Sequence, residues 1–141
     1  MPRKSAPSWF YEQSAVIPFR RRQHGVEILL ITSRGKKRWI FPKGVIDPGL
    51  TARGSALKEA REEAGIEGKI LENPVGEYHY EKWNGSIRVQ VFAMEVTRTL
   101  EHWEEEDERE RKWLHAGRAA DRLDRKELRS MLRRFLRHLD D

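Results

Sequence analysis

The chain has 141 residues and a formal net charge of +5, with 28 Lys/Arg against 23 Asp/Glu. This length is enough for one compact core, so we expect a single domain over residues 1–141. The absence of cysteine excludes disulfides, thiolate zinc sites and cysteine nucleophiles. No apolar run approaches the roughly 18 residues of a membrane span, and the basic N-terminus lacks the apolar segment of a secretory signal. We therefore expect a cytoplasmic protein with no membrane partner.

Charge is unevenly distributed along the chain. Residues 1–43 carry a net charge of +8, residues 44–116 a net charge of −6, and the remainder a net charge of +3. A basic segment beside an acidic one suits a ligand that is both anionic and metal-bound. The alternative is that the many arginines form an ordinary solvated surface.

The first third of the chain has the pattern of a short arm followed by strands. We expect residues 1–12 to form a loosely ordered N-terminal arm, with Trp9, Phe10 and Tyr11 packing back on the domain. Apolar and β-branched runs bounded by turn residues predict three strands, over residues 14–20, 26–32 and 39–41. A turn over residues 21–25 is expected to join the first two strands.

The middle of the chain predicts a helix and a hairpin. Thr51 is a suitable N-cap, and Gly65 suits the left-handed position that ends a helix, so we expect a helix over residues 52–64. Two strands, over residues 69–82 and 86–97, are expected to flank Asn84-Gly85, which is a strong hairpin signal.

The last third contains a charge run, a short strand and an amphipathic helix. We expect residues 104–112 in a loop and residues 113–115 in a strand. Asp124 and Glu127 have the spacing of a capping box, which predicts a helix over residues 124–139. Its apolar residues recur at helical spacing: Leu128, Met131, Leu132, Phe135, Leu136 and Leu139. Strands mixed with two helices predict an α/β fold, with a mixed β-sheet sandwiched between α-helices.

Three carboxylates lie close together at the end of the predicted helix 52–64. At 100° per residue, Glu62 lies about 60° to one side of Glu59 and Glu63 about 40° to the other, so all three share one face. Like charges at this spacing destabilise a helix. A hard divalent cation with oxygen ligands would offset their repulsion, which makes this face a candidate metal site.

Residues 44–66, GVIDPGLTARGSALKEAREEAGI, resemble the signature of the Nudix (MutT-like) hydrolases. Seven residues fall on the positions of that signature: Gly44, Glu59, Ala60, Glu62, Glu63, Gly65 and Ile66. Leu50 stands where the family has its first Glu, and Lys58 stands where it has Arg. In the family these two residues are thought to pair and to orient the metal-binding glutamates. We therefore expect the pair to be lost here and activity to be retained.

A second resemblance concerns residues 103–113. They are similar to the Trp-x-Glu…Arg-x-Arg-x-Trp segment of diadenosine polyphosphate and diphosphoinositol polyphosphate hydrolases, through Trp103, Glu105, Arg109, Arg111 and Trp113. A solvated loop is the alternative for residues 104–110. For Arg111, beside Trp113, a functional role or a buried ion pair is expected.

The Nudix resemblance implies a metal site and a catalytic base. Glu59, Glu62 and Glu63 would bind Mg²⁺, with Mn²⁺ as a substitute, and the backbone carbonyl of Lys43 would be a further ligand. Glu62 is also the expected base that activates water, and Glu105 is a second catalytic candidate.

Substrate contacts are expected from arginines and one glycine. The guanidinium fork suits polyphosphate oxygens, and Gly44 permits a close approach of the backbone to metal or phosphate. The expected phosphate-binding arginines are Arg20, Arg34, Arg38 and Arg111.

The expected function is Mg²⁺-dependent hydrolysis of a phosphoanhydride bond in dinucleoside polyphosphates or diphosphoinositol polyphosphates, which are small anionic substrates. One alternative is an RNA 5′-end pyrophosphohydrolase or another hydrolase of nucleoside diphosphates linked to a group X. A second alternative, motivated by Leu50 and Lys58, is a Nudix domain that binds nucleotide or RNA without hydrolysing it. The sequence leaves open whether the protein is a monomer or a homodimer.

Overall fold

The structure is a computed structural model that describes residues 6–35 and 38–139. Residues 1–5 of the expected N-terminal arm lie outside the described residues. The elements are, in chain order, the 3-10 turn η1 (Ser8–Tyr11), β1 (Glu12–Arg22), β2 (Gly25–Thr32), β3 (Trp39–Ile40), β4 (Lys43–Val45), α1 (Ala52–Ala64), β5 (Ile66–Ile70), β6 (Gly76–Lys82), β7 (Gly85–Thr99), β8 (Arg111–His115), α2 (Ala116–Arg122) and α3 (Lys126–Leu139).

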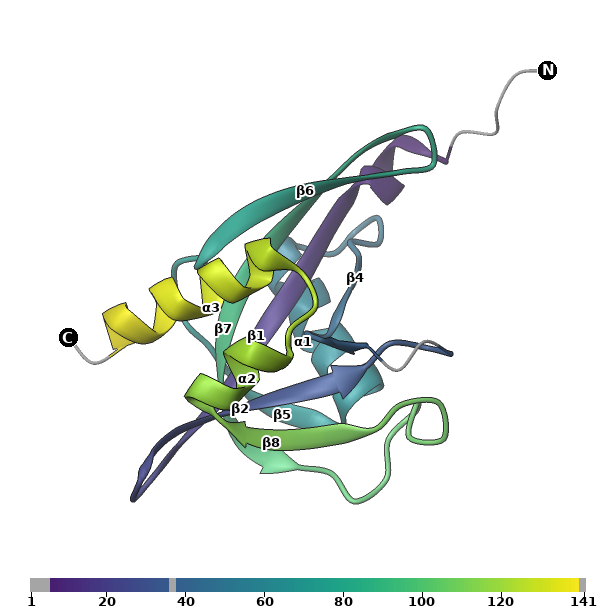
Figure 1. Cartoon of the computed structure of the whole chain (residues 1–141). Helices are drawn as coiled ribbons and strands as arrows, with labels where there is room; N and C mark the ends of the chain where they lie inside the picture. Colours follow the sequence, from purple (N-terminus) through teal and green to yellow (C-terminus); the bar gives the residue numbers. More distant parts are fainter. Residues whose placement is uncertain (1–5, 36–37, 140–141) are drawn as a thin grey trace.

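The strands of the described residues form one mixed sheet (Figure 1). Its main order is β3-β2-β1-β7-β5, while β4 pairs with β1, β6 with β7 and β8 with β2. β1 and β7 run parallel, and the other pairs are antiparallel. The long strand β7 therefore joins the two halves of the sheet, because it pairs with β1 on one edge and with β5 and β6 on the other.

Helices cover both faces of this sheet, and each face has its own hydrophobic core (Figure 1). α1 covers one face, where Ala56, Ala60 and Ala64 belong to the same cluster as Val16 of β1. α2 and α3 cover the other face, which receives the residues of β1 on either side of Val16. The predicted α/β fold with a mixed sheet between helices is confirmed. None of the helices in the described part of the chain is long and apolar enough to cross a bilayer.

α1 begins and ends where its capping residues predict. The Thr51 hydroxyl accepts a hydrogen bond from the Gly54 N–H at 2.9 Å, and Gly65 adopts a left-handed conformation with φ of 63°. A Cβ atom on Gly65 would lie 2.7 Å from both the Trp103 ring and the Arg111 guanidinium. Both the backbone conformation and the packing therefore require glycine at this position.

The predicted hairpin is present, but its turn lies one residue earlier than expected. Lys82 pairs with Gly85, so Trp83 and Asn84 are the two loop residues. Their φ angles are 53° and 59°, as a type I′ turn requires.

The described end of the N-terminal arm packs against this hairpin. The ring of Phe10 lies 5.1 Å from that of Trp83, and the Tyr11 hydroxyl donates a hydrogen bond to the Trp83 carbonyl. Trp9 is more exposed and contacts Phe10 edge-on.

The prediction of one strand over residues 69–82 is wrong, because the structure has two separate strands there, β5 and β6. Both pair with β7 on the same edge, and the segment between them contains Pro74, which has no N–H to donate to a ladder. Leu71 and Val75 still donate backbone hydrogen bonds to β7, which keeps the segment on the sheet.

Other boundaries also differ from expectation. The turn predicted over residues 21–25 shrinks to Gln23 and His24, because β1 extends to Arg22 and β2 starts at Gly25. β8 starts at Arg111, two residues before the predicted start of the strand 113–115. Neither β4 nor α2 was predicted. α3 begins at Lys126, so Asp124 lies two positions before it, where its carboxylate pairs with Arg38 at 3.3 Å.

We predict that Leu132→Ala destabilises the protein strongly, because Leu132 is fully buried between α3 and the sheet. Truncation of a buried leucine costs about 2–5 kcal/mol. Leu57→Ala is the matched control, since Leu57 is 39% exposed on α1, and it should cost below about 1 kcal/mol. Urea unfolding of the two variants measures the difference, and equal losses would contradict the assigned core.

Candidate active site

Two glutamates of α1 turn toward β4. The Glu63 carboxylate accepts a hydrogen bond from the backbone N–H of Lys43 at 3.1 Å. The Glu59 carboxyl lies against Gly44, in the space that a Cβ atom would need there. Gly44 therefore permits the close approach that the sequence predicted, although the group that approaches it in this structure is Glu59.

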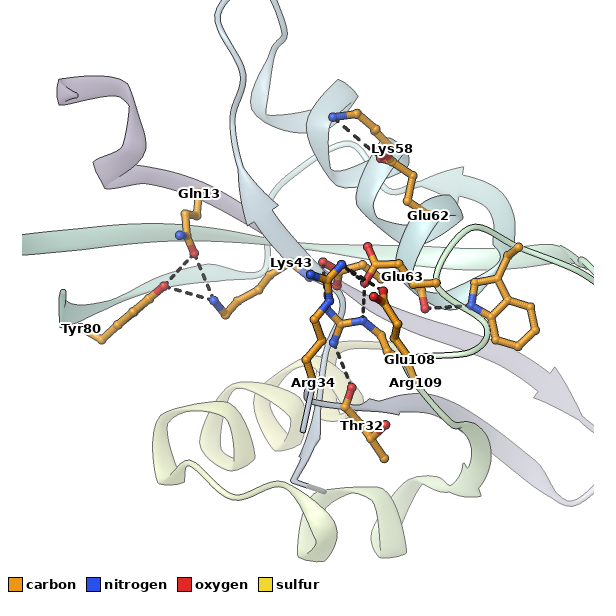
Figure 2. Close-up of polar contacts among 12 residues, drawn as sticks. Gln13, Thr32, Arg34, Lys43, Lys58, Glu62, Glu63, Tyr80, Glu108 and Arg109 are labelled. Atoms are coloured by element: carbon orange, nitrogen blue, oxygen red, sulfur yellow. Dashed lines mark hydrogen bonds and ion pairs between the residues drawn. The ribbon is translucent and has the colours of Figure 1, made fainter. Parts of the chain in front are cut away.

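A network of ion pairs extends from the buried Glu63 toward the surface (Figure 2). Arg109 lies 3.6 Å from Glu63 and 2.8 Å from Glu105, and its guanidinium also donates to the Thr32 carbonyl at 2.9 Å. The side chains of Glu63 and Arg109 are each only 9% exposed. Arg34, at the surface, pairs with Glu105 at 3.0 Å. The network alternates acidic and basic groups, so each buried charge has a partner.

The segment between β7 and β8 is fixed to the C-terminal end of α1. The Trp103 indole donates to the Glu63 carbonyl at 3.1 Å, and the Glu105 N–H donates to the Glu62 carbonyl at 3.1 Å. Arg111 stacks on the Trp103 ring at 3.8 Å. These contacts bring Glu105 beside the helix carboxylates and pack part of the segment on α1, while Glu104, Asp107, Glu108 and Glu110 stay exposed.

Glu62 lies on another side of the helix from Glu63 and is partly exposed. Its carboxylate is 3.8 Å from the ammonium of Lys58, which lies 2.8 Å from Asp47 (Figure 2 shows the contact with Glu62). The pair between positions 50 and 58 is therefore absent, but Lys58 has another acidic partner in Asp47.

Electrostatic effects in this region act mainly on the α1 glutamates. Burial and the neighbouring Glu63 carboxylate raise the pKa of Glu59 to about 8. Burial also raises the pKa of Glu63, although Arg109 and the Lys43 N–H oppose it, and burial raises the pKa of Glu62. Glu59 and Glu63 are thus two crowded carboxylates in a largely water-free position.

The residues present fit a divalent cation in part. Within residues 6–35 and 38–139, no three acidic or histidine side chains already surround a common point. Glu59 and Glu63 nevertheless offer adjacent carboxylate oxygens, the donor type that Mg²⁺ prefers. Ser14 of β1 pairs with Gly44 of β4. Its hydroxyl is buried, and the described residues provide no hydrogen-bond partner for it. Glu59 and Glu63 are therefore the residues that would hold such a cation.

A cleft of about 290 Å³ opens beside this cluster. Six cationic side chains line it: Arg34, Arg38, Lys43, Lys82, Arg109 and Arg125. The α1 glutamates are not among the described lining residues. Lys43 and Arg109 form the wall on that side, and both contact Glu63. The acidic cluster and the basic cleft are therefore neighbours.

Tyr80 forms an aromatic wall of the cleft. The ammonium of Lys43 donates to the Tyr80 hydroxyl at 3.1 Å and to Gln13 at 3.2 Å (Figure 2). The guanidinium of Arg125 lies 5.1 Å from the centre of the Tyr80 ring and 5.5 Å from that of Tyr78. A cation therefore covers these aromatic rings.

Two of the four predicted phosphate-binding arginines line the cleft, and two do not. Arg34 and Arg38 lie there and are largely exposed. Arg20 lies away from the cleft, because it pairs with Glu27 at 2.7 Å and lies on β1 five residues, or roughly 17 Å, beyond the position that pairs with Lys43.

Arg111 also lies outside the described lining of the cleft. Its guanidinium donates to the backbone carbonyls of Ala64, Gly65 and Leu100 at 2.6–3.1 Å. These bonds satisfy carbonyls at the end of α1, so Arg111 holds the helix and does not face the cleft.

Arg109 and Arg125 received no individual role from the sequence. For Arg109 a signal exists, because Glu105 and Arg109 have the i,i+4 spacing of a helical ion pair, and one helical turn does form there. Arg125 has no such signal, since its contacts depend on where α3 packs.

We predict that Arg109→Gln destabilises the metal-free protein by about 3 kcal/mol, because it leaves Glu63 and Glu105 buried without this partner. Arg34→Gln is the matched control. It removes a second partner of Glu105, but Arg34 is 60% exposed, so the expected loss is below about 1 kcal/mol. Urea unfolding in the presence of a chelator measures both, and a larger loss for Arg34→Gln would contradict this assignment.

Comparison with known proteins agrees with the geometry. The chain matches the NUDIX domain model over residues 11–136. It is 31% identical over 136 residues to Nudix hydrolase 13, mitochondrial, of Arabidopsis thaliana, which covers 89% of this chain and 66% of that protein. It is 34% identical over 109 residues to diphosphoinositol polyphosphate phosphohydrolase 3-alpha of Mus musculus, which covers 76% of this chain and 65% of that protein. The chain thus spans just under two thirds of these curated relatives.

Among solved structures, the binary complex of a C. elegans Ap4A hydrolase superimposes with a TM-score of 0.75 at 25% identity, over 92% of this chain and 97% of that one. The E. coli dihydroneopterin triphosphate pyrophosphohydrolase shares the fold, with a TM-score of 0.72 at 17% identity. Because the domain match extends over nearly the whole described chain and includes the glutamate-bearing helix, the protein belongs to the Nudix hydrolase family.

Proposed function

We propose that this protein is a Mg²⁺-dependent phosphohydrolase that cleaves a phosphoanhydride bond in diphosphoinositol polyphosphates or dinucleoside polyphosphates. The observation that carries the proposal is the position of the α1 glutamates directly beside a cleft lined by six cationic side chains. A metal-bound polyphosphate needs both kinds of surface at once. Two relatives named above, a diphosphoinositol polyphosphate phosphohydrolase and an Ap4A hydrolase, support this choice of substrates.

In the proposed reaction, water attacks one phosphorus of the anhydride, the bridging P–O bond breaks and the other phosphate leaves. Glu62 accepts the proton of the attacking water, since it is the least enclosed of the three α1 glutamates. Glu59 and Glu63, with the Lys43 carbonyl, would hold the cation, which supplies charge neutralisation at the phosphate oxygens. Glu105 stays a second candidate for the base, although two guanidiniums already contact it.

Arg34 and Arg38 bind the phosphates from the mouth of the cleft in this proposal. The Arg125 guanidinium covers the rings of Tyr78 and Tyr80. The group X beyond the anhydride would therefore contact this guanidinium and not a free aromatic surface. A nucleobase would have to displace the guanidinium in order to stack there, whereas a phosphate would pair with it. This favours an anionic group X, as in a diphosphoinositol polyphosphate.

The substrate class is tested by incubating the protein and Mg²⁺ with an inositol pyrophosphate, diadenosine tetraphosphate, a nucleoside triphosphate, ADP-ribose and 5′-triphosphorylated RNA. We expect the first two to be cleaved fastest. Preferred cleavage of RNA, with binding that weakens steeply as salt rises, would support the alternative of an RNA 5′-end pyrophosphohydrolase. Binding without any turnover would support a non-catalytic domain, and preferred cleavage of ADP-ribose would contradict the proposed substrates.

We predict that Glu62→Gln lowers kcat on the preferred substrate by about 100-fold or more, because the amide cannot accept the proton of water. Its unfolding midpoint should stay close to that of the wild type, since Glu62 is partly exposed. Glu72→Gln is the matched control, an exposed glutamate between β5 and β6 whose backbone carbonyl accepts a hydrogen bond from Arg53, near the start of α1. Unchanged turnover in Glu62→Gln would refute the assigned base.

A second prediction concerns the group X. Arg125→Ala should raise KM for an inositol pyrophosphate about tenfold, the effect of losing one charge-assisted contact, and should change KM for diadenosine tetraphosphate by less than about twofold. Arg133→Ala, on an exposed part of α3 outside the cleft lining, should change neither value. Equal effects of Arg125→Ala on both substrates would contradict the preference for an anionic group.

Cellular location and assembly stay predictions. We keep the cytoplasm as the proposed compartment, although two Arabidopsis relatives bear mitochondrial names. The proposed assembly is a monomer or a homodimer.

A further inference from the structure

The loop between β4 and α1 contains a tight turn formed by Asp47, Pro48, Gly49 and Leu50. The Leu50 N–H donates to the Asp47 carbonyl at 3.0 Å, and Gly49 has φ of 91°. Proline at the second position and a positive φ at the third are typical of a type II turn. The turn brings its first and fourth residues close together in space, directly before the N-cap of α1.

Asp47 uses this position to contact α1 one turn before Glu62. Its carboxylate lies 2.8 Å from the ammonium of Lys58, and the same ammonium lies 3.8 Å from the Glu62 carboxylate. Lys58 is therefore shared between two acids, and Asp47 makes the shorter contact. Asp47 and Lys58 are each 43% exposed, so the pair adds little to stability.

We propose that Asp47 is a positioning residue for Glu62 and acts through Lys58. While Asp47 holds the ammonium, Lys58 stays at the edge of Glu62 and leaves that carboxylate free to face water. Without Asp47, the ammonium can close on Glu62 as an ordinary i,i+4 pair and turn it away from the reacting water. This inference rests on the proposed function, because Glu62 is the base assigned there.

The turn offers a direct way to test this inference. Because Leu50 occupies the other end of the same turn and is 42% exposed, a carboxylate at position 50 would reach the Lys58 ammonium from nearly the same place. Leu57 is a matched control position. It is 39% exposed on α1 but points about 100° away from Lys58 around the helix axis.

The experiment compares Asp47→Asn, Asp47→Asn/Leu50→Glu and Asp47→Asn/Leu57→Glu, with diadenosine tetraphosphate and Mg²⁺ as the probe. We expect Asp47→Asn to lower kcat by about threefold to tenfold with little change in KM, because only the orientation of the base is affected. Leu50→Glu should return kcat to within about twofold of the wild type, and Leu57→Glu should not. An unchanged kcat in Asp47→Asn, or equal recovery by both second substitutions, would overturn the inference.

Lys58→Gln provides an independent readout that does not depend on Asp47→Asn folding well. In the Lys58→Gln background, adding Asp47→Asn should lower kcat no further, because Asp47 acts on Glu62 only through the Lys58 ammonium. Additive losses would overturn the inference. If the wild type cleaves none of the probes, the proposed function fails and this inference fails with it, whereas an active wild type with an unaffected Asp47→Asn rejects the inference alone.

Discussion

Repulsion among the carboxylates at the end of α1 is the constraint on which the rest of the site depends. Glu59 and Glu63 lie next to each other in a largely buried position, and burial raises the pKa of both. Such a cluster costs free energy unless positive groups or hydrogen-bond donors compensate it. The protein supplies three kinds of compensation: the guanidinium of Arg109, the backbone N–H of Lys43 and the ammonium of Lys58.

Two of these groups come from outside the helix, and the third, the ammonium of Lys58, belongs to α1 itself and is held by Asp47. Lys43 is the first residue of β4, Arg109 lies just before β8, and Lys58 depends on a turn that follows β4. The parallel pairing of β1 with β7 and the pairing of β4 with β1 hold these segments against α1. A small alanine-rich face lets the helix approach the sheet closely enough for its glutamates to reach them. The fold therefore places positively charged groups and an N–H donor beside the glutamates at one end of α1.

The sequence predicted correctly those elements that carry capping or turn residues at their own ends. Thr51 and Gly65 fix the ends of α1, and the Asn84-Gly85 pair located the hairpin to within one residue. Short elements without such signals were missed, since β4 has three residues and α2 has no side-chain cap. β5 and β6 were merged into one expected strand, although Pro74 between them has no N–H to donate to a ladder. Asp124 had the spacing of a cap, but it pairs with Arg38 instead, since the helix starts two residues later.

By itself, the sequence determined the fold class, the family and the helix that carries Glu59, Glu62 and Glu63, because helical periodicity and a contiguous motif are local properties. Only the tertiary structure decided which arginines belong to the site. Arg20, Arg111, Arg109 and Arg34 carry the same charge, and apart from the i,i+4 spacing of Glu105 and Arg109 nothing in their neighbours along the chain separates them. Arg111 satisfies carbonyls at the end of α1, while Arg109 joins two acids that are 42 positions apart, Glu63 and Glu105. A guanidinium takes its role from the oxygens that folding places within its reach, and those oxygens come from distant parts of the chain.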